Sequence, residues 1–415
     1  MISVNNKLNI ELMINNAIST ASITDIHTHL FSECFGELFL FGIDELLTYH
    51  YLVAEALRYD GVDYQQFFNL SKEEQAEYVW KVLFVDNTPI SEPARSVITI
   101  LNKLGLDVNQ KDLNYYREFF RAQKLSSYVD RIFKITNIKC LIMTNDPLDQ
   151  NERGVWEKGY VKDSRFRAAL RIDGILNSRE SSFPQLRAFG YKVEDDLSGT
   201  TIEEIKRFLI EWIEKMDALY CAVSLPPDFS MLDGSKRVEI IENCVLPVCK
   251  GKNIPLALMI GVKRAVNPEL RLAGDSLAKT DIKALEYLCA KYPQNKFLVT
   301  ILSLENQHEF VITARKFRNL MPFGCWWYLN SPSLIEQITR MRLEWLGMSF
   351  IPQHSDCRVF EQLISKWEHS KAVLAKVLIE KYNDLIQMGY ELSEEKINRD
   401  IQNLLGDNFW RFISQ

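Results

Sequence analysis

Short apolar runs alternate with helical patterns along most of this chain of 415 residues. Runs of this length that are rich in β-branched residues and bounded by turn residues are typical of buried strands. Strands that alternate with helices predict an α/β fold with a parallel sheet, and eight of them predict a closed (β/α)8 barrel of the TIM type. The eight predicted strands are Ile23–Phe31, Ile138–Thr144, Phe166–Ile172, Tyr220–Leu225, Ile254–Val262, Lys296–Leu302, Met321–Tyr328 and Ser349–Ser355.

Amphipathic helices are predicted between the later strands, where apolar residues recur three and four positions apart among strong helix formers. These helices are Thr201–Met216, Lys236–Lys250, Asp281–Lys291, Gln307–Phe317 and Ser333–Leu346. After the eighth strand we predict two extra C-terminal helices, a long one over Cys357–Gly389 and a final one over Ser393–Ile413.

Residues 34–134 interrupt the alternation, because they contain no convincing buried strand. Ile43–Tyr59, Ser71–Phe84 and Leu113–Lys124 have helical patterns rich in aromatic residues instead. We therefore predict a helical insertion after strand 1, on the C-terminal rim where the loops of such barrels build active sites. Residues 1–415 would then form a single barrel domain, since barrels with insertions reach this size.

Composition and charge exclude several classes of protein. Apolar residues make up 47% of the chain and charged residues 25%, so a large core and a folded chain are expected. A formal net charge of −6 without a long run of Lys or Arg argues against nucleic acids and anionic membranes as partners. The eight cysteines lack a C-x-x-C pair, which is typical of buried thiols in a reducing compartment. No signal peptide or membrane span is visible, so we expect a cytoplasmic protein.

His27 and His29 stand one residue apart inside the first predicted strand. Residues i and i+2 of a strand share a face, so both imidazoles would point the same way, as the first two ligands of a divalent metal must. Two half-exposed histidines with ordinary hydrogen bonds are an equally good interpretation of this pair alone.

Asp356 strengthens the metal interpretation. It follows the eighth predicted strand, which neighbours strand 1 in a closed barrel, and the chemistry of such barrels lies at the C-terminal ends of the strands. Two neutral imidazoles and one carboxylate would leave coordination positions open for water or substrate, as catalytic metal sites do.

Arg171 ends strand 3, and Arg358 follows Asp356 by two residues. A guanidinium in a barrel mouth suits a substrate carboxylate through a bidentate pair. Each Arg alone is better interpreted as an ordinary ion pair with a neighbouring acid. Their convergence on a rim that carries a candidate metal favours substrate binding.

Together these residues resemble the uronate isomerase (glucuronate isomerase) family of the amidohydrolase superfamily. The resemblance runs in the family's order from about residue 20 to the C-terminus, and the combination is more specific than any single motif. The matching segments are Thr24–Leu30 (TDIHTHL), His50-Tyr51 with Arg58 after them, Thr144–Pro147 (TNDP), Leu170–Asp173 (LRID), Phe323–Trp327 (FGCWW) and Ser355–Arg358 (SDCR).

The resemblance implies an aldose–ketose isomerase that interconverts D-glucuronate with D-fructuronate and D-galacturonate with D-tagaturonate. It implies that one divalent ion, with zinc as the expected metal, is held by His27, His29 and Asp356. Arg171, Arg358 and Trp326 would bind the sugar acid. Asp356, Tyr51 and His50 would be catalytic, with Asp356 as the base for ring opening and Tyr51 or His50 acting on the C1/C2 proton or oxygens. A homo-oligomer without nucleic-acid or membrane partners is expected.

One position departs from the family pattern. Where these enzymes carry a His in strand 5, this chain has Met259, and a thioether is a poor ligand for a hard divalent ion. His354 could compensate, since it lies two residues before Asp356, although a position behind the ligands or in rim packing is the better interpretation. Trp327 is expected on the opposite face of the strand from Trp326, toward the helix layer.

A metal-dependent hydrolase of the same superfamily is the alternative function. Binuclear members need a bridging Lys or Glu from strand 4 and His residues from strands 5 and 6, which the predicted strands do not supply. A mononuclear deaminase, lactonase or decarboxylase stays open. A non-enzymatic interaction protein on a degenerate barrel would make the His, Asp and Arg residues coincidences.

Overall fold

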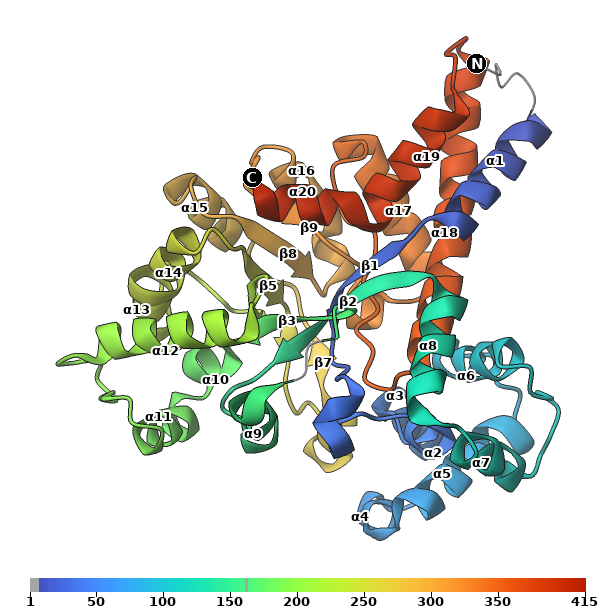
Figure 1. Ribbon diagram of the computed structural model, residues 1–415, viewed down its shortest axis with the longest axis horizontal. Coiled ribbons are helices and arrows are strands. Elements are labelled where there is room, and N and C mark those ends of the chain that lie inside the picture. The colour runs from blue at the N-terminus through green and yellow to red at the C-terminus, as the bar shows by residue number, and fades with distance from the viewer. Residues whose placement is uncertain (1–6, 161–162) are drawn as a thin grey trace.

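A curled parallel sheet of seven strands forms the centre of the computed structural model, which describes residues 7–160 and 163–415 (Figure 1). Its strand order is β1-β2-β3-β4-β5-β8-β9, and every neighbouring pair is parallel. This architecture is consistent with a TIM-type barrel. The strands are β1 Ile23–Thr28, β2 Ile138–Asn145, β3 Phe166–Arg171, β4 Cys221–Leu225, β5 Leu256–Ile260, β8 Phe297–Ile301 and β9 Leu320–Pro322.

The eighth predicted strand, Ser349–Ser355, makes no regular ladder. It forms one isolated bridge, between Ile351 and Phe323, because Pro352 has no backbone N–H to donate and Gly324 turns the chain out of β9 at a φ of +64°. The segment still contacts β1 on its other side. Asp356 N donates to His27 O at 3.1 Å, and His29 N donates to Cys357 O at 2.8 Å.

An antiparallel hairpin follows β5 and was not predicted from the sequence. It pairs β6 Val262–Lys263 with β7 Ser276–Leu277, and the 3-10 segment η4 Pro268–Gly274 lies between these strands. The predicted strand Ile254–Val262 thus ends at Ile260, because Gly261 bends the chain at a φ of +118°.

The helices cover the outside of the sheet, and those between β1 and β2 gather in one helical segment (Figure 1). The helices of this segment are α2 Ile43–Leu47, α3 His50–Asp60, α4 Tyr64–Asn69, α5 Lys72–Trp80, α6 Glu92–Lys103, α7 Leu113–Arg121 and α8 Leu125–Thr136, with the short turns η1 Glu33–Leu38 and η2 Lys81–Val85. The helices between later strands are α9 Gln150–Gly159, α10 Asp173–Asn177, α11 Arg179–Ala188, α12 Thr201–Met216, α13 Lys236–Ile240, α14 Leu246–Gly251, α15 Lys283–Lys291, α16 Gln307–Ala314 and α17 Pro332–Leu346, with η3 Ile241–Val245, η5 Leu304–Asn306 and η6 Trp327–Leu329. The terminal helices are α1 Lys7–Thr20, α18 Gln362–Gln387, α19 Glu394–Gln402 and α20 Asn408–Ser414, with η7 Asn403–Asp407.

The predicted helix Thr201–Met216 is confirmed to the residue as α12, whereas the predicted helix Ile43–Tyr59 is broken. Tyr49 adopts an extended conformation between α2 and α3, so α3 begins anew at His50. The predicted helix Cys357–Gly389 starts late, at Gln362, because the Gln362 Oε1 accepts hydrogen bonds from the backbone N–H groups of Arg358 and Val359. Tyr49 and Arg358 therefore lie outside the helices, and the side chains of both line the cavity at the C-terminal ends of the strands.

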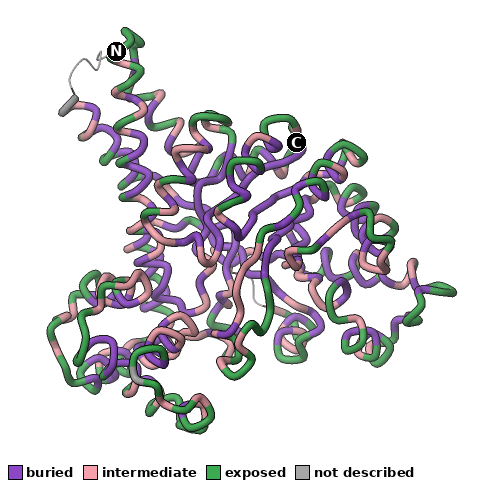
Figure 2. Tube along the Cα trace, turned by 180° about the vertical axis from the view of Figure 1, so that it is seen from behind, coloured by how far each residue is buried: buried purple, intermediate pink, exposed green. Residues whose placement is uncertain are grey.

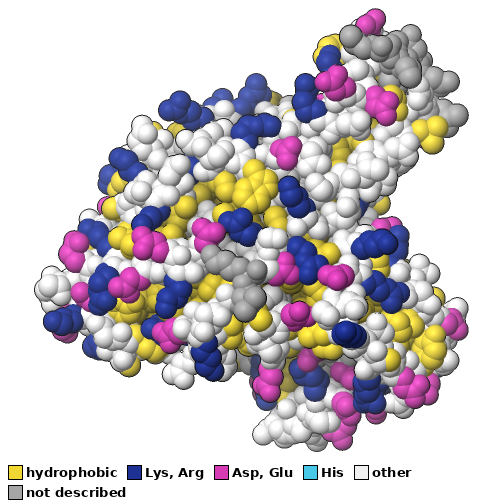
Figure 3. Space-filling model, in the orientation of Figure 1, with side chains coloured by type: hydrophobic (Ala, Val, Ile, Leu, Met, Phe, Trp, Pro, Cys, Tyr) yellow, Lys and Arg dark blue, Asp and Glu magenta, His cyan; other side chains and the backbone are white. Residues whose placement is uncertain are grey.

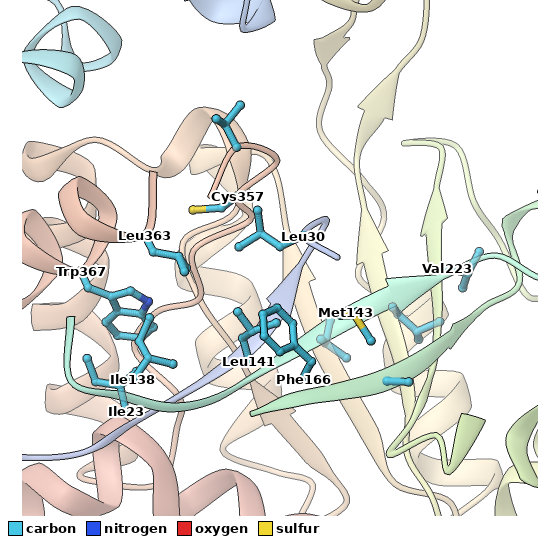
Figure 4. Close-up of a cluster of buried hydrophobic side chains, with 14 of the residues drawn as sticks. Ile23, Leu30, Ile138, Leu141, Met143, Phe166, Val223, Cys357, Leu363 and Trp367 are labelled. Carbon is cyan, nitrogen blue, oxygen red and sulfur yellow. The ribbon is translucent and has the colours of Figure 1, made fainter. Parts of the chain in front are cut away.

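The core lies on both faces of the strands, which are buried along their length while exposure concentrates on the outer helices (Figure 2). Figure 4 shows Leu363 and Trp367 of α18 near Ile23 and Ile138, the first residues of β1 and β2. Trp367 also donates its indole N–H to Asp25 Oδ2 at 2.9 Å. At the N-terminal end of the sheet, Phe409 and Phe412 of α20 belong to the same apolar cluster as Ile26 and Tyr220, so that end is filled by side chains.

Charged side chains are spread over the surface of the protein. On the face shown in Figure 3, basic and acidic side chains are interspersed. None of the helices within residues 7–160 and 163–415 combines the length and the apolar character that crossing a bilayer requires. All eight cysteines are free thiols, and Cys34 is the exposed one.

Glu361 joins the helical segment to the start of α18. Its carboxylate is fully buried, and Oε1 accepts hydrogen bonds from Gly42 N at 3.1 Å and Tyr128 OH at 2.9 Å. Burial raises the pKa of Glu361 from 4.5 to about 7. Between those pH values Glu361 is protonated in the folded protein and ionised in the unfolded chain. The contribution of this carboxyl group to the free energy of unfolding is therefore complete below pH 4.5 and is lost as the pH rises to about 7.

We expect Glu361→Gln to remove this pH dependence, because the amide keeps the accepting oxygen and cannot ionise. The free energy of unfolding of the variant relative to wild type should rise by roughly 3 kcal/mol between the two ends of that window. Urea denaturation at pH 5 and at pH 8 measures the difference. An equal difference between the two proteins at both pH values would contradict a buried carboxyl that loses its proton in this range.

Candidate active site

A cavity opens at the C-terminal ends of the strands, and the empty space within it and its mouth is about 540 Å³. All eight site residues predicted from the sequence line it, together with several that were not predicted. The predicted residues are His27, His29, His50, Tyr51, Arg171, Trp326, Asp356 and Arg358. The additional residues are Tyr49, Thr144, Asp173, Ala222, Val223, Ser224, Met259, Arg264 and Trp327.

His27, His29 and Asp356 form a compact group in this cavity. Asp356 Oδ1 lies 3.6 Å from His27 Nε2 and 3.4 Å from His29 Nε2. Ligand atoms about 2.1 Å from one tetrahedral ion stand about 3.4 Å apart, so these separations match the edges of such a site. His27 Nε2 and Asp356 Oδ1 are buried and have no hydrogen-bond partner, which is costly unless a cation or proton lies between them. The three residues therefore fit one divalent ion.

Hydrogen bonds behind the two imidazoles orient their Nε2 atoms toward Asp356. Tyr220 OH donates to Ile26 O at 2.6 Å and lies 3.3 Å from His27 Nδ1, so its oxygen is left to accept from Nδ1–H. Thr144 Oγ1 donates to Thr28 O at 2.8 Å and in the same way accepts from His29 Nδ1, at 3.1 Å. Both rings thus carry their proton on Nδ1 and present the Nε2 lone pair to the cavity, which is the tautomer a metal requires.

Burial keeps both imidazoles neutral. Loss of solvation lowers the pKa of His27 to about 3, although the Asp356 carboxylate acts in the opposite direction. Loss of solvation, with Arg358 and Arg171 nearby, also holds the pKa of His29 well below its usual value. The contacts of Asp356 with these rings are therefore not ordinary ion pairs at neutral pH.

The backbone of Asp356 aims its carboxylate at the two rings. Its φ is +54°, in the left-handed region that Asp and Asn tolerate best after Gly. The hydrogen bond from Asp356 N to His27 O fixes this turn against β1.

His354 packs behind this group and does not join it. It is fully buried, and its ring centroid lies 5.4 Å from that of His27 and 5.1 Å from that of Phe323. The compact ligand group among the described residues contains His27, His29 and Asp356 without His354. Gly324 makes room for the ring, since a Cβ at that position would come within 1.8 Å of His354 Nδ1.

The two arginines differ in their partners. Arg171 Nε donates to Asp173 Oδ2 at 3.0 Å, and Coulombic attraction to Asp173 is the main cause that raises the pKa of Arg171. The Arg358 guanidinium forms no ion pair within residues 7–160 and 163–415. Arg358 thus offers an unneutralised cation to the cavity, and Arg171 offers one that is held in place by a carboxylate.

The aromatic side of the cavity comes from the start of α3 and from the chain after β9. The ring of His50 lies 4.4 Å from that of Tyr51 and 6.0 Å from that of Trp327. Burial lowers the pKa of His50 to about 3, and neither of its ring nitrogens has a hydrogen-bond partner in the described part of the chain. Burial, Tyr49 and Asp356 raise the pKa of Tyr51 well above its usual value. At neutral pH Tyr51 is therefore a hydrogen-bond donor.

Solved structures resemble this chain over its full length, whereas no family model and no curated sequence matches it. A uronate isomerase from Bacillus halodurans C-125 has 52% sequence identity over 100% of this chain and 98% of its own, with a TM-score of 0.97. The chain belongs to the uronate isomerase family. A uronate isomerase from Thermotoga maritima (17% identity, TM-score 0.76, 100% of both chains) and a glucuronate isomerase from Caulobacter crescentus (15%, 0.78, 98% of this chain and 94% of that one) share the fold.

Met259 occupies the position in β5 where the sequence analysis expected a His from the resemblance. Met259 is 2% exposed and lines the cavity from β5. A thioether there adds apolar surface and no ligand for a hard ion, so the group that could hold a metal is His27, His29 and Asp356 without a residue of β5.

The prediction for Trp327 was wrong. Alternation along a strand placed it toward the helix layer, but β9 ends at Pro322, and Trp327 begins η6 at a φ of +48°. Alternation does not apply outside a strand, and the ring of Trp327 turns into the cavity, stacked 5.1 Å from Tyr328.

Two of the lining residues that the sequence analysis missed, and one residue behind the lining, have positions that explain why they were missed. Tyr49 lies at the break before α3, Tyr220 lies before β4, and Arg264 follows β6. Two of these residues could have been found from the sequence. Tyr49 directly precedes the predicted His50-Tyr51 pair, and Arg264 is a cation near the end of a predicted strand. Tyr220 acts through a contact with a residue 193 positions away, which no local pattern predicts.

Proposed function

We propose that this protein interconverts the aldose and ketose forms of hexuronic acids, D-glucuronate with D-fructuronate and D-galacturonate with D-tagaturonate. The observation that carries the proposal is the cavity itself. In a chain of the uronate isomerase family, it combines a compact His-His-Asp group with an Arg358 guanidinium that has no acidic partner among the described residues. Such a cavity suits a substrate that has a carboxylate at one end and an oxygen-rich reacting end.

His27, His29 and Asp356 would hold one divalent ion, and zinc suits a set of two imidazoles and a carboxylate. When bound, the ion lowers the free energy of negative charge that develops on the C1 and C2 oxygens of the substrate. Arg171, Arg358 and Trp326 would orient the sugar acid, with the guanidinium groups on its C6 carboxylate. The mononuclear hydrolase remains the alternative that the assays below are designed to exclude.

Proton transfer is assigned to the side chains around the ligand group. The sugar ring opens first: a base removes the proton of the anomeric hydroxyl, the C1–O5 bond breaks and O5 takes up a proton. Isomerisation then moves a proton between C2 and C1 through an enediolate. Asp356 is the proposed base for ring opening. Tyr51 is protonated at neutral pH, so it is suited to donate a hydrogen bond or proton to the C1 or C2 oxygen, beside neutral His50.

We further propose that residues 1–415 form one domain in which the segment after β9 closes the sheet onto β1 as an eighth barrel strand. The two backbone hydrogen bonds between that segment and β1 support this closure. In the same proposal residues 34–134 are a helical insertion over the barrel mouth, and α3 reaches the cavity from it. A homo-oligomer stays a prediction, which light scattering on the purified protein would check.

A direct assay tests the function. Purified protein, loaded with zinc, is incubated with D-glucuronate and with D-galacturonate, and ¹H NMR follows the loss of the anomeric signals and the formation of ketose. Solvent deuterium should appear at the transferred position if the proton exchanges at the enediolate. A parallel panel of lactones and N-acyl amino acids tests hydrolysis. Turnover in that panel without ketose formation from either uronate would transfer the assignment to the hydrolase alternative.

Tyr51→Phe is expected to lower kcat about 10- to 100-fold while KM changes little, because the variant loses a hydroxyl that donates in the reaction and keeps the ring. Steady-state kinetics with glucuronate, metal content and the thermal midpoint are measured together. Tyr328→Phe is the matched control, since Tyr328 OH donates to Asp275 O and its ring lies 5.9 Å from that of Tyr51. Equal losses in both variants would indicate a packing effect and exclude the role of the Tyr51 hydroxyl.

A further inference from the structure

A second chamber, which opens to solvent, lies beside the candidate active site, and the empty space within it and its mouth is about 980 Å³. The two cavities share Tyr49, His50, Tyr51 and Trp327 as a common wall. The second chamber lies where the helical segment between β1 and β2 meets η6 and α18, and none of the proposed catalytic steps uses it.

Apolar side chains form most of the lining of the second chamber. Aliphatic residues come from α2, α3 and α6, and aromatic rings come from the common wall and from Tyr328. Ala54 lies on α3, and Val97 and Ile100 lie on α6. A flat apolar body placed among these groups would gain free energy from leaving water.

One cation in the lining has no partner. Lys366 extends from α18, and within residues 7–160 and 163–415 its ammonium forms no ion pair or hydrogen bond. Glu92 is the acidic residue in the lining. Its Oε1 lies 2.6 Å from His369 Nδ1, and its Oε2, which has no hydrogen-bond partner among the described residues, lies 3.4 Å from the guanidinium of Arg95. Arg95 is thus the counter-ion of Glu92, and the Lys366 ammonium is left without a carboxylate of its own.

A neutral hydrogen-bond donor, the side-chain amide of Asn330, lies in the same lining. Asn330 lines the chamber and is 8% exposed, and its Nδ2 has no partner because Oδ1 accepts the hydrogen bond from Gln353 Nε2 at 3.1 Å. On the common wall, the indole N–H of Trp327 and the two ring nitrogens of neutral His50, one a donor and the other an acceptor, are also buried without a partner among the described residues, and these two residues line both cavities. Buried polar atoms without partners are rare in folded proteins, so the Asn330 amide, in the same lining as the Lys366 ammonium, points to an acceptor that occupies the second chamber.

We propose that the second chamber is a binding site for a small monocarboxylate with an apolar ring, distinct from the cavity that carries the His-His-Asp group. The carboxylate would pair with Lys366 and accept from Asn330, and the ring would lie among the aliphatic residues of α3 and α6. Because the occupant would contact the back of His50 and Tyr51, its binding would lower the rate of the reaction proposed above. That effect rests on the proposed function, whereas the binding does not.

Calorimetric titration with phenylacetate tests the site. Wild-type protein is expected to bind one molecule per chain, and Lys366→Met, which keeps the length of the stem and removes the charge, should weaken binding at least tenfold. The neutral analogue 2-phenylethanol should bind equally to both proteins. Ala54→Trp should block the chamber and abolish binding, with the thermal midpoint as the check on folding. If Ala54→Trp does not fold, the comparison of Lys366→Met with wild type still decides.

Two further arms separate this site from the active site. Arg358→Met should leave the affinity for phenylacetate unchanged, and phenylacetate should lower kcat without raising KM for glucuronate. Absence of binding at millimolar phenylacetate, or binding weakened by Arg358→Met and not by Lys366→Met, would overturn the proposal. Tighter Lys366-dependent binding of D-gluconate than of phenylacetate would overturn the apolar ligand class. Lys366-dependent binding in a protein that isomerises neither uronate would retain the site and reject the proposed function.

Discussion

Asp356→Asn is expected to abolish tight binding of one divalent ion and to lower kcat by about three orders of magnitude or more, since the variant loses both a ligand and the proposed base. The contacts of Asp356 Oδ1 with His27 Nε2 and His29 Nε2 at 3.6 and 3.4 Å support both roles. An amide is a weak ligand and cannot accept a proton at neutral pH. Elemental analysis after zinc loading and dialysis, with kcat measured on glucuronate, gives the result.

Asparagine is the appropriate replacement at this position, because the residue has a φ of +54° and Asn tolerates that conformation as Asp does. The thermal midpoint of the metal-free variant should therefore stay close to that of the metal-free wild type. His27→Ala should also lose the ion, through a different ligand. Two tightly bound ions in wild type, none under any loading, or unchanged zinc content in both variants would refute the three-residue site.

Arg171→Lys and Arg358→Lys are each expected to lower kcat/KM for glucuronate by roughly two to three orders of magnitude. A lysine keeps the positive charge but has no planar fork for a bidentate carboxylate contact, and a buried substrate carboxylate with an unsatisfied oxygen costs several kcal/mol. The larger loss is expected for Arg358, whose guanidinium has no partner in the described chain, whereas Arg171 already pairs with Asp173. Steady-state kinetics with both uronates provides the measurement.

Glucose provides the control for what the arginines recognise. It has the stereochemistry of glucuronate and no carboxylate, so wild type should not turn it over at a measurable rate. Arg167→Lys is the matched control variant. Arg167 belongs to β3, forms an ion pair with Asp217 at 3.2 Å and does not line the cavity, so this variant should have the kinetics of wild type. Comparable turnover of glucose and glucuronate, or wild-type kinetics in both site variants, would remove the carboxylate from the recognition model.

Much of the strand and helix pattern could be predicted, because it depends on the spacing of apolar residues within single segments. Thr201–Met216 is a helix with the predicted bounds, and five of the predicted strands were located to within about two residues at each end. The errors occur where backbone geometry breaks the period. Gly261 and Gly324 have positive φ and end two predicted strands early, which produces an unpredicted hairpin and reverses the direction of Trp327.

The candidate site shows the same division. The residue types that suit a metal and a carboxylate were evident from the sequence, since His27 and His29 share a strand face and Asp356 and Arg358 follow the last apolar run. The protonation states of these residues, and whether other side chains already engage them, could not be predicted from the sequence. Tyr220 selects the tautomer of His27 from 193 residues away. Asp173 engages Arg171, while Arg358 has no ion pair within the residues that the structure describes.

Periodicity and residue chemistry are local properties, so the sequence established an α/β chain with a strand-borne His-x-His pair and the order of its main elements. Hydrogen bonding and burial depend on contacts between distant segments. The bond from Ser355 N to Asp25 Oδ1 spans 330 positions and helps hold the last segment against β1, and only that approach brings the Asp356 carboxylate to the two imidazoles. The burial that keeps those imidazoles neutral, and the chamber behind His50 and Tyr51, likewise arise from packing between elements.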